Sequence, residues 1–394
     1  MKTWRSRFLA DAAQWESAGL RRRRRVVRPL SATEIEIDGK AVTAFASNDY
    51  LGLARDPRLA EALAEGARRY GAGAGASPLV SGHHAVHEAL ECALARFAGK
   101  PAALHFMNGY VANLALLTTL AGDGGAIFSD RLNHASLIDG ARLSRAPVEV
   151  YPHADAGALE ALLRASGATH KLVVTDAVFS MDGDVAPLED LLALCERHDA
   201  LLVVDDAHGI GVRGPEGRGS VQALGLDSDC LVYMGTLGKA AGLSGAFVAA
   251  DPLIIDRLVQ RARTYVFSTA APPALAHATL TALELIRSAD AARTQLAAHR
   301  ERLQDAAPAW LPYRLLASST PIQPLVVGGN KAVVQVADAL LEQGLWAPAI
   351  RPPTVPAGSA RLRIALSAAH RAEDIERLCA ALTRIAARAA TIAA

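Results

Sequence analysis

Two polar segments that follow short apolar runs carry the side chains best suited to covalent chemistry. Lys239 follows the run 231–234 and is flanked by small and apolar residues, and a partly desolvated amine is a usable nucleophile toward an aldehyde. Asp205 and His208 follow the run 201–204. An isolated Asp-x-x-His is more often a turn cap beside an ordinary loop histidine, so this pair gains meaning only together with Lys239.

These residues match what pyridoxal phosphate (PLP) requires of a protein, namely an amine, an acid for the ring nitrogen and donors for the phosphate. Lys239 could supply the amine and Asp205 the acid. Thr236 offers a hydroxyl to the phosphate. Gly109 and Tyr110 offer backbone N–H groups at the start of a predicted helix, whose N-terminus favours an anion.

Two further residues complete the predicted cofactor site. His134 could lie against the ring, and Ser180 lies in the segment 178–184 that follows another apolar run. By itself that segment reads as a tight turn of Asp and Gly. Each assignment is weak alone, but together they predict one PLP site.

The apolar runs predict the sheet that must position this site. They are short and continuously apolar, as in strands covered on both faces. The clearest ones are 172–175, 201–204, 231–234 and 246–249. A helical pattern lies between the first two, which predicts a mainly parallel sheet of the α/β class.

Changes of pattern along the chain predict three segments. Residues 1–45 would form an N-terminal arm of one helix and a β-ribbon, in which residues 34–39 alternate and end at Asp-Gly. Residues 46–285 would form the large PLP-binding domain. Residues 286–394 would form a smaller α+β domain.

The composition argues against several other classes of protein. Lys and Arg number 41 against 40 Asp and Glu, so no overall charge favours nucleic acid or a membrane surface. The histidines show no metal-ligand spacing, and we expect no metal site. The four cysteines are scattered, and neither a secretory segment nor a membrane-spanning run is visible, so we expect a cytoplasmic protein.

The motifs occur in the order found in a known family. They are residues 47–53, 71–82, 133–136, 178–183, 205–209 and 238–239. Nearly the whole chain thus resembles the α-oxoamine synthases, which are fold-type I PLP-dependent enzymes. The resemblance implies a homodimer that condenses an amino acid with an acyl thioester and releases CO2.

The resemblance also implies a role for each cofactor residue. Lys239 would bind PLP covalently and move the substrate proton, and Asp205 would pair with the ring nitrogen. His208 and Ser180 would bind the ring oxygen, and His134 would cover the ring and contact substrate. Gly109, Tyr110 and Thr236 would hold the phosphate.

Five further residues match substrate-binding positions of the family. Arg363 and Asn48 would bind the amino-acid carboxylate, and Arg351 and Thr354 would meet the acyl substrate. Arg21, or its neighbour in the run of five arginines 21–25, would also bind substrate.

The segment 349–358 resembles the members that use L-alanine and a pimeloyl thioester, carried by CoA or acyl carrier protein. Members that use glycine or serine, and a non-catalytic binding module, remain alternatives.

Overall fold

The computed structural model describes residues 3–122 and 124–393. The chain divides into two compact units. Unit 1 consists of Met1–Tyr50, Met181–Gly183 and Ala292–Ala394, and unit 2 of Leu51–Ser180 and Asp184–Ala291. The three segments expected from the sequence, with boundaries at residues 45 and 285, stay a prediction.

Unit 2 is built on a seven-stranded sheet with the order β4-β10-β9-β8-β7-β5-β6. Its strands are β4 (Ala102–Phe106), β5 (Gly125–Asp130), β6 (Val148–Tyr151), β7 (His170–Asp176), β8 (Ala200–Asp205), β9 (Leu231–Thr236) and β10 (Ala246–Ala250). All neighbouring pairs from β6 to β9 are parallel, whereas β10 runs antiparallel to β9 and β4. The four predicted strands are β7 to β10, so the expected α/β fold with a mainly parallel sheet is confirmed.

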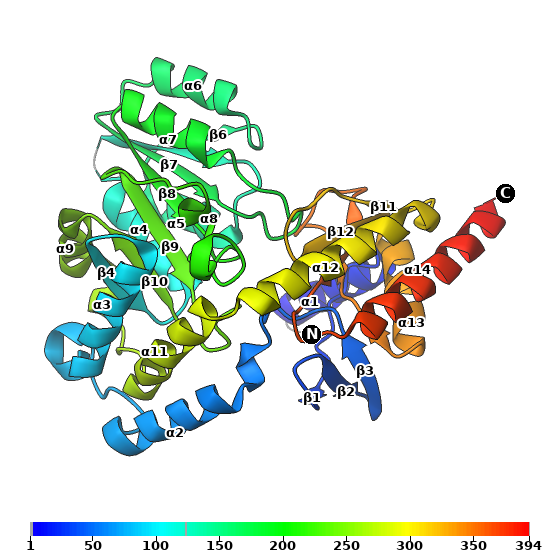
Figure 1. Ribbon diagram of the computed structural model, residues 1–394. Coiled ribbons are helices and arrows are strands. Elements are labelled where there is room, and N and C mark those ends of the chain that lie inside the picture. The colour runs from blue at the N-terminus through cyan, green and yellow to red at the C-terminus, as the bar shows by residue number, and fades with distance from the viewer. Residues whose placement is uncertain (1–2, 123, 394) are drawn as a thin grey trace. The chain divides into compact units, whose positions relative to one another are not determined.

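Helices cover both faces of this sheet (Figure 1). The helices of unit 2 are α2 (Pro57–Tyr70), α3 (Ala85–Ala98), α4 (Gly109–Leu120), α5 (Ala135–Ser144), α6 (Ala156–Ala165), α7 (Leu188–Arg197), α8 (Ser220–Ala223), α9 (Pro252–Arg261), α10 (Arg263–Val266) and α11 (Pro273–Arg287). Ala246 and Val248 of β10 pack into the core that includes α4, while Phe247 points to the other face and contacts Tyr233. Burial on both faces explains why these strands are continuously apolar.

Unit 1 contains two four-stranded sheets, with the orders β1-β2-β3-β13 and β11-β12-β15-β14. Their strands are β1 (Val27–Pro29), β2 (Glu34–Ile37), β3 (Lys40–Ala44), β11 (Arg314–Leu315), β12 (Ile322–Gly328), β13 (Leu345–Trp346), β14 (Ala349–Ile350) and β15 (Ala360–Ala365). The principal helices are α1 (Thr3–Ser17), α12 (Asp290–Ala306), which begins in unit 2, α13 (Asn330–Glu342) and α14 (Ala372–Ala393). The predicted ribbon is present: β2 and β3 join at Asp38 and Gly39, whose φ angles of 51° and 79° suit a tight hairpin.

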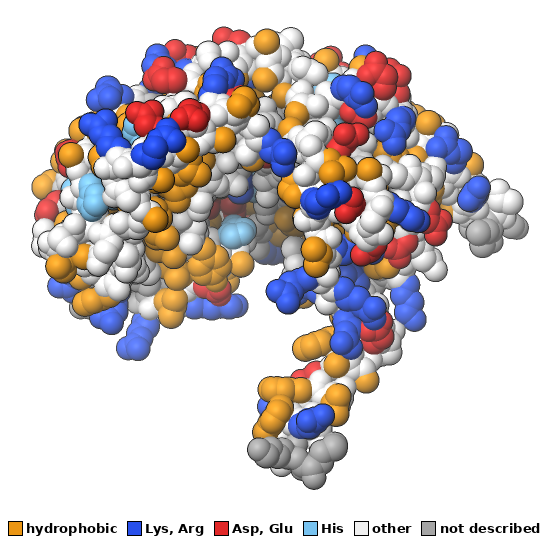
Figure 2. Space-filling view, turned by 90° about the horizontal axis from the view of Figure 1, so that it is seen from below, with side chains coloured by type: hydrophobic (Ala, Val, Ile, Leu, Met, Phe, Trp, Pro, Cys, Tyr) orange, Lys and Arg blue, Asp and Glu red, His pale blue; other side chains and the backbone are white. Residues whose placement is uncertain are grey.

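Helix α1 projects from the rest of unit 1 and presents apolar and basic side chains to its surroundings (Figure 2). None of its residues is buried, and Trp4, Phe8 and Trp15 are each more than half exposed. Over the described part of the chain, no helix has the length and hydropathy that crossing a bilayer requires.

Gly66→Ala should lower the free energy of unfolding by about 1–2 kcal/mol. The added methyl group on α2 would lie 2.9 Å from the Cα atom of Ala274 on α11 and 3.0 Å from its carbonyl oxygen, so backbone must shift. The better helix propensity of alanine offsets only part of this cost. Urea denaturation measures the change. Gly167→Ala is the control, because its methyl group would have no neighbour within 4 Å; equal stability of the two variants would contradict tight packing of α2 on α11.

Candidate active site

Side chains able to bind a charged ligand lie at the carboxyl ends of the parallel strands in unit 2. Asp176 ends β7, Asp205 ends β8 and Thr236 ends β9, while His134 caps helix α5 directly after β5. Because these strands are parallel, their ends lie along one edge of the sheet, where ligands bind in open α/β folds.

Asp205 is a buried carboxylate with a donor on each oxygen. It is 3% exposed. The backbone N–H of Ala207 donates to Oδ1 at 3.0 Å, and the amide of Asn113 donates to Oδ2 at 2.7 Å. Such bonds offset the cost of burying a charge. Burial and the negative charge of Asp205 raise the pKa of Asp176, so Asp176 is protonated more readily than an exposed aspartate.

Lys239 lies in the loop between β9 and β10, and its Nζ is 2.8 Å from Nε2 of His208. An ammonium group can only donate, so this imidazole nitrogen accepts. His208 is buried and Lys239 is half-buried, between the fully buried Leu237 and Ala240. The amine is therefore fixed against the loop that follows β8 and does not extend into bulk water.

The N-terminus of α4 lies beside Thr236. A Cβ atom built on Gly109, the first residue of α4, would lie 3.8 Å from Oγ1 of Thr236. The backbone at Gly109 and this hydroxyl therefore border the same space, and a helix N-terminus beside a hydroxyl suits a phosphate. Tyr110 comes next, and its exposed phenol donates to Asp139.

His134 is held as the cap of α5. Its backbone N–H donates to Oδ2 of Asp176 at 2.6 Å, and its Nδ1 accepts from the backbone N–H of Ser136 at 3.3 Å. Partial removal from water lowers the pKa of His134, while the charge of Asp205 opposes this effect. A neutral imidazole suits contact with a cationic ring.

A charged histidine joins the loops that follow β5, β6 and β7. The ring of His153 donates to Asp130 at 3.0 Å and to Asp184 at 2.6 Å, and it packs edge-on against Phe179. Its hydrogen bonds to the two carboxylates raise the pKa of His153 to about 10. These contacts hold the turn that carries the half-buried Ser180.

In unit 1, the predicted carboxylate-binding residues Arg363 and Asn48 contact each other. Nη1 of Arg363 donates to Oδ1 of Asn48 at 3.0 Å, and Nη2 donates to the phenol of Tyr50 at 3.4 Å. Arg361, two residues earlier on β15, forms an ion pair of 2.6 Å with Asp182. Both arginines are buried, so their guanidinium groups are held in fixed orientations.

A cavity of about 800 Å³ in unit 1 brings the other three predicted substrate residues together. Arg21, Arg351 and Thr354 all line it. Arg22 donates to Oγ1 of Thr354 at 3.2 Å, whereas Nε of Arg21 lies 3.5 Å from Glu16. Burial and the positive charge of Arg22 lower the pKa of Arg351. The cavity is therefore lined by several cations and suits an anionic ligand.

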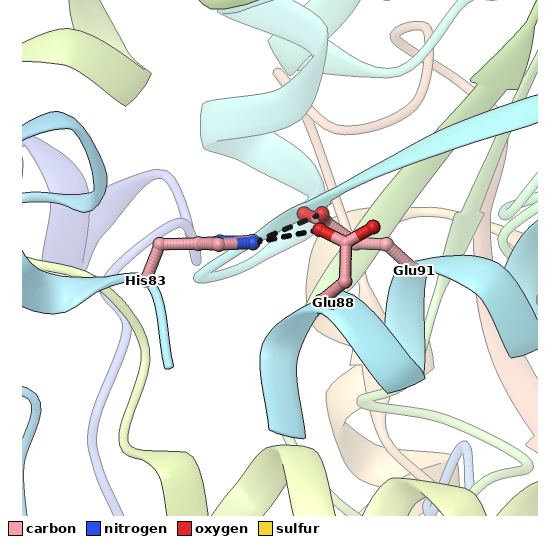
Figure 3. A group of neighbouring side chains, drawn as sticks. All are labelled: His83, Glu88 and Glu91. Atoms are coloured by element: carbon pink, nitrogen blue, oxygen red, sulfur yellow. Dashed lines mark hydrogen bonds and ion pairs between the residues drawn. The ribbon is translucent and has the colours of Figure 1, made fainter. Parts of the chain in front are cut away.

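One group of possible metal ligands comes together among the described residues. His83 points toward Glu88 and Glu91 on successive turns of α3 (Figure 3). Nε2 of His83 lies 3.1 Å from Glu88 and 3.9 Å from Glu91, and burial raises the pKa of Glu91 to about 7. These are ion-pair contacts in which His83 and Glu88 are exposed. The absence of a metal site stays a prediction.

The sequence analysis did not predict a role for three residues of these networks. No sequence pattern pairs His153 or Arg361 with a carboxylate, because only the fold brings those groups together. Asn113 could have been identified, because it is a lone amide in the otherwise apolar helix segment 111–117, four residues after Gly109 and hence on the same face.

The side chains of unit 2 fit PLP by their chemistry. A fixed amine at Lys239, a buried acid at Asp205 and an anion-binding helix terminus at Gly109 lie at the same sheet edge. The chain thus supplies the three kinds of group that this cofactor requires.

Comparison with known proteins agrees with this chemistry. The family model "Aminotransferase class I and II" matches residues 40–382. An 8-amino-7-oxononanoate synthase from Burkholderia thailandensis is 59% identical over 382 residues, which cover 95% of this chain and 96% of that protein.

Solved structures extend the similarity to the fold. A serine palmitoyltransferase structure containing PLP superposes with a TM-score of 0.91 at 30% identity, over 97% of each chain. An 8-amino-7-oxononanoate synthase from Francisella tularensis superposes with a TM-score of 0.76 at 28% identity, over 87% of this chain and 97% of that one. The fold-type I architecture expected from the sequence is therefore confirmed.

His153→Gln should destabilise the protein at pH 6 but much less at pH 10.5. The folded-state pKa of about 10 lies above the value near 6.5 for an unperturbed histidine. The contribution is therefore complete below about pH 6.5 and is lost as the pH rises through about 10. Allowing for solvent screening, we expect a loss of about 1–2 kcal/mol at pH 6. Urea denaturation at both pH values tests this, with the exposed His170→Gln as control; a difference independent of pH would contradict it.

Proposed function

The chain belongs to the class I and II aminotransferase family and, within it, to the 8-amino-7-oxononanoate synthases, and we propose that it condenses L-alanine with a pimeloyl thioester in biotin biosynthesis. A C–C bond forms between the alanine α-carbon and the thioester carbonyl carbon. The C–S bond breaks, the alanine carboxylate leaves as CO2, and the products are 8-amino-7-oxononanoate and the free thiol. The observation that carries this proposal is the grouping of Lys239, His208 and Asp205 at one sheet edge.

PLP, when bound, supplies an electron-withdrawing ring that stabilises negative charge on the amino-acid α-carbon. Lys239 provides the amine for its attachment. Asp205 keeps the ring nitrogen positively charged, since a carboxylate ~3 Å from a cation gains roughly 5 kcal/mol at an effective dielectric near 20. The backbone N–H groups of Gly109 and Tyr110 and the hydroxyl of Thr236 hold the phosphate.

Three further residues orient the reacting groups. With the cofactor bound, His134 would cover its ring and contact substrate, and Ser180 and His208 would form hydrogen bonds with its ring oxygen. Lys239 removes and returns the α-proton. Its 2.8 Å contact with His208 supports this role, because it holds the amine beside the loop that directly follows Asp205.

Two sets of residues in unit 1 bind the substrates. Arg363, held by Asn48, pairs with the amino-acid carboxylate, because a guanidinium binds a carboxylate through two parallel bonds. Arg351, Thr354 and Arg21 bind the acyl substrate. The cationic cavity that these three residues line supports this assignment, since the pimeloyl chain ends in a carboxylate.

The acyl carrier is CoA or acyl carrier protein, both polyanions that would be attracted to the arginine run 21–25. A homodimer is part of the proposal. The exposed apolar side chains of α1 support it, because such a surface is commonly covered by a partner. A cytoplasmic location stays a prediction, supported by cysteines that form no disulfide.

A second candidate is the same condensation with serine or glycine in place of L-alanine. The structural likeness to serine palmitoyltransferase favours it. Mass spectrometry of the products formed from pimeloyl-CoA and each of the three amino acids decides between them. A product mass specific to glycine or serine, with none from L-alanine, would replace our proposal.

Lys239→Ala should abolish product formation and remove the visible absorbance of the covalently attached cofactor. Lys239 is the amine that the structure places beside His208, and alanine has no group that could replace it. We expect at least a ~10³-fold loss of kcat, as for removal of a nucleophile. Absorbance spectra and product assays measure both effects. Lys171→Ala, on the N-terminal side of β7, is the control; an unchanged spectrum with full activity would exclude Lys239.

Arg22→Gln should raise the KM for pimeloyl-CoA about 5–10-fold and weaken its dependence on salt, with a smaller effect on kcat. Arg22 lines the cavity and contacts Thr354, so its charge acts on the anionic substrate. KM measured at low and high NaCl tests this. The control is Arg28→Gln, a mostly exposed arginine paired with Glu36. The same salt dependence in wild type and Arg22→Gln would contradict a substrate role.

A further inference from the structure

We infer that Asn113 is a positioning residue whose one amide group sets both the orientation of Asp205 and the tautomer of His134. This inference rests on the proposed function only in that Asp205 and His134 contact the cofactor ring. Asn113 lies on α4 and is 0% exposed. It therefore acts on any ligand only through its neighbours.

Both hydrogens of the Asn113 amide are used. Nδ2 donates to Oδ2 of Asp205 at 2.7 Å and to Oγ of Ser136 at 2.9 Å. A primary amide has two N–H donors, so one group joins the end of β8 to the start of α5. The bond to Asp205 involves a charge and is short, as charge-assisted bonds are.

The second bond sets the protonation of His134. Oγ of Ser136 accepts from Asn113, so the Ser136 hydroxyl can direct its own hydrogen to Nδ1 of His134, 2.7 Å away. The backbone N–H of Ser136 also donates to this nitrogen. Nδ1 is therefore an acceptor, and the neutral ring carries its proton on Nε2.

The side-chain oxygen of Asn113 shows what fixes the orientation of the amide group. Oδ1 of Asn113 is buried and has no hydrogen-bond partner among the described residues. The reversed amide would place this oxygen 2.7 Å from the carboxylate of Asp205, where two acceptors repel. The protein tolerates an unpaired carbonyl, which is unfavourable, in order to present both donors. A residue that only filled space would need no such arrangement.

Loss of these donors should weaken cofactor binding. Without Asn113, Oδ2 of Asp205 loses its side-chain donor, and the carboxylate can rotate away from the ring nitrogen. Loss of a hydrogen bond to a charged group corresponds to about a tenfold or larger change in affinity. We expect the dissociation constant of PLP to rise by at least this factor.

Asn113→Asp and Asn113→Leu separate positioning from packing. Aspartate has the shape of asparagine but places an acceptor beside Asp205, whereas leucine fills similar space without donors. If Asn113 only packs, Asn113→Leu, which fills similar space and adds no charge, should bind PLP as wild type does. If it positions, both variants should bind PLP about tenfold or more weakly. Thr119→Val, at a buried polar residue on the same helix, is the matched control and should bind PLP as wild type does.

The measurements are PLP titration of each apoprotein by absorbance, its melting temperature, and the ¹⁵N shifts of His134. Wild type should show the Nε2–H tautomer, and Asn113→Leu a mixture of tautomers. Wild-type PLP affinity in Asn113→Asp would overturn the inference. A loss of PLP affinity in Asn113→Leu that its lower melting temperature fully explains would also overturn it. No substrate is present, so a wrong substrate assignment would leave these results unchanged and would show only in the product assay.

Discussion

A negative charge buried at the end of a strand is the feature on which the site in unit 2 depends. Asp205 is almost fully removed from water, and such a charge is tolerated only when donors surround it. The fold supplies them from the next loop, at Ala207, and from a helix on the sheet face, at Asn113. Burial and the charge of Asp205 raise the pKa of Asp176, which limits the like charge nearby. Strand, loop and helix are thus tied to one carboxylate.

The same principle extends along the sheet edge. His134 is held by Asp176 and Ser136, and Lys239 by His208, so these side chains are oriented by hydrogen bonds within the chain. Groups held in this way need little rearrangement when a ligand arrives, which favours both affinity and catalysis. Loops built at the ends of rigid parallel strands allow this degree of order.

Unit 1 handles its buried charges differently. Its two buried arginines on β15 are oriented by neighbours in the same unit, and Arg361 forms an ion pair with Asp182. Arg363 is oriented by Asn48 and by the phenol of Tyr50, which burial keeps protonated by raising its pKa. In the cavity, burial and the positive charge of the neighbouring Arg22 lower the pKa of Arg351. An anionic substrate would relieve that repulsion.

The strands and the main site residues could be predicted from the sequence, because their signals are local. A continuously apolar run such as 231–234 reports a strand buried on both faces, and a reactive residue just after it must lie at the sheet edge. The ribbon at Asp38 and Gly39 was predictable for the same reason, since the turn chemistry lies in adjacent residues.

Only the tertiary structure decided which partner each polar residue meets. The amide of Asn113 reaches a carboxylate 92 residues away, and Arg361 reaches Asp182 across 179 residues. The ion pairs of His153 likewise join three separate loops. Hydrophobic periodicity is a property of neighbouring residues and can be read from the chain. A hydrogen bond requires two atoms within about 3 Å, and for residues far apart in sequence only the folded backbone sets that distance.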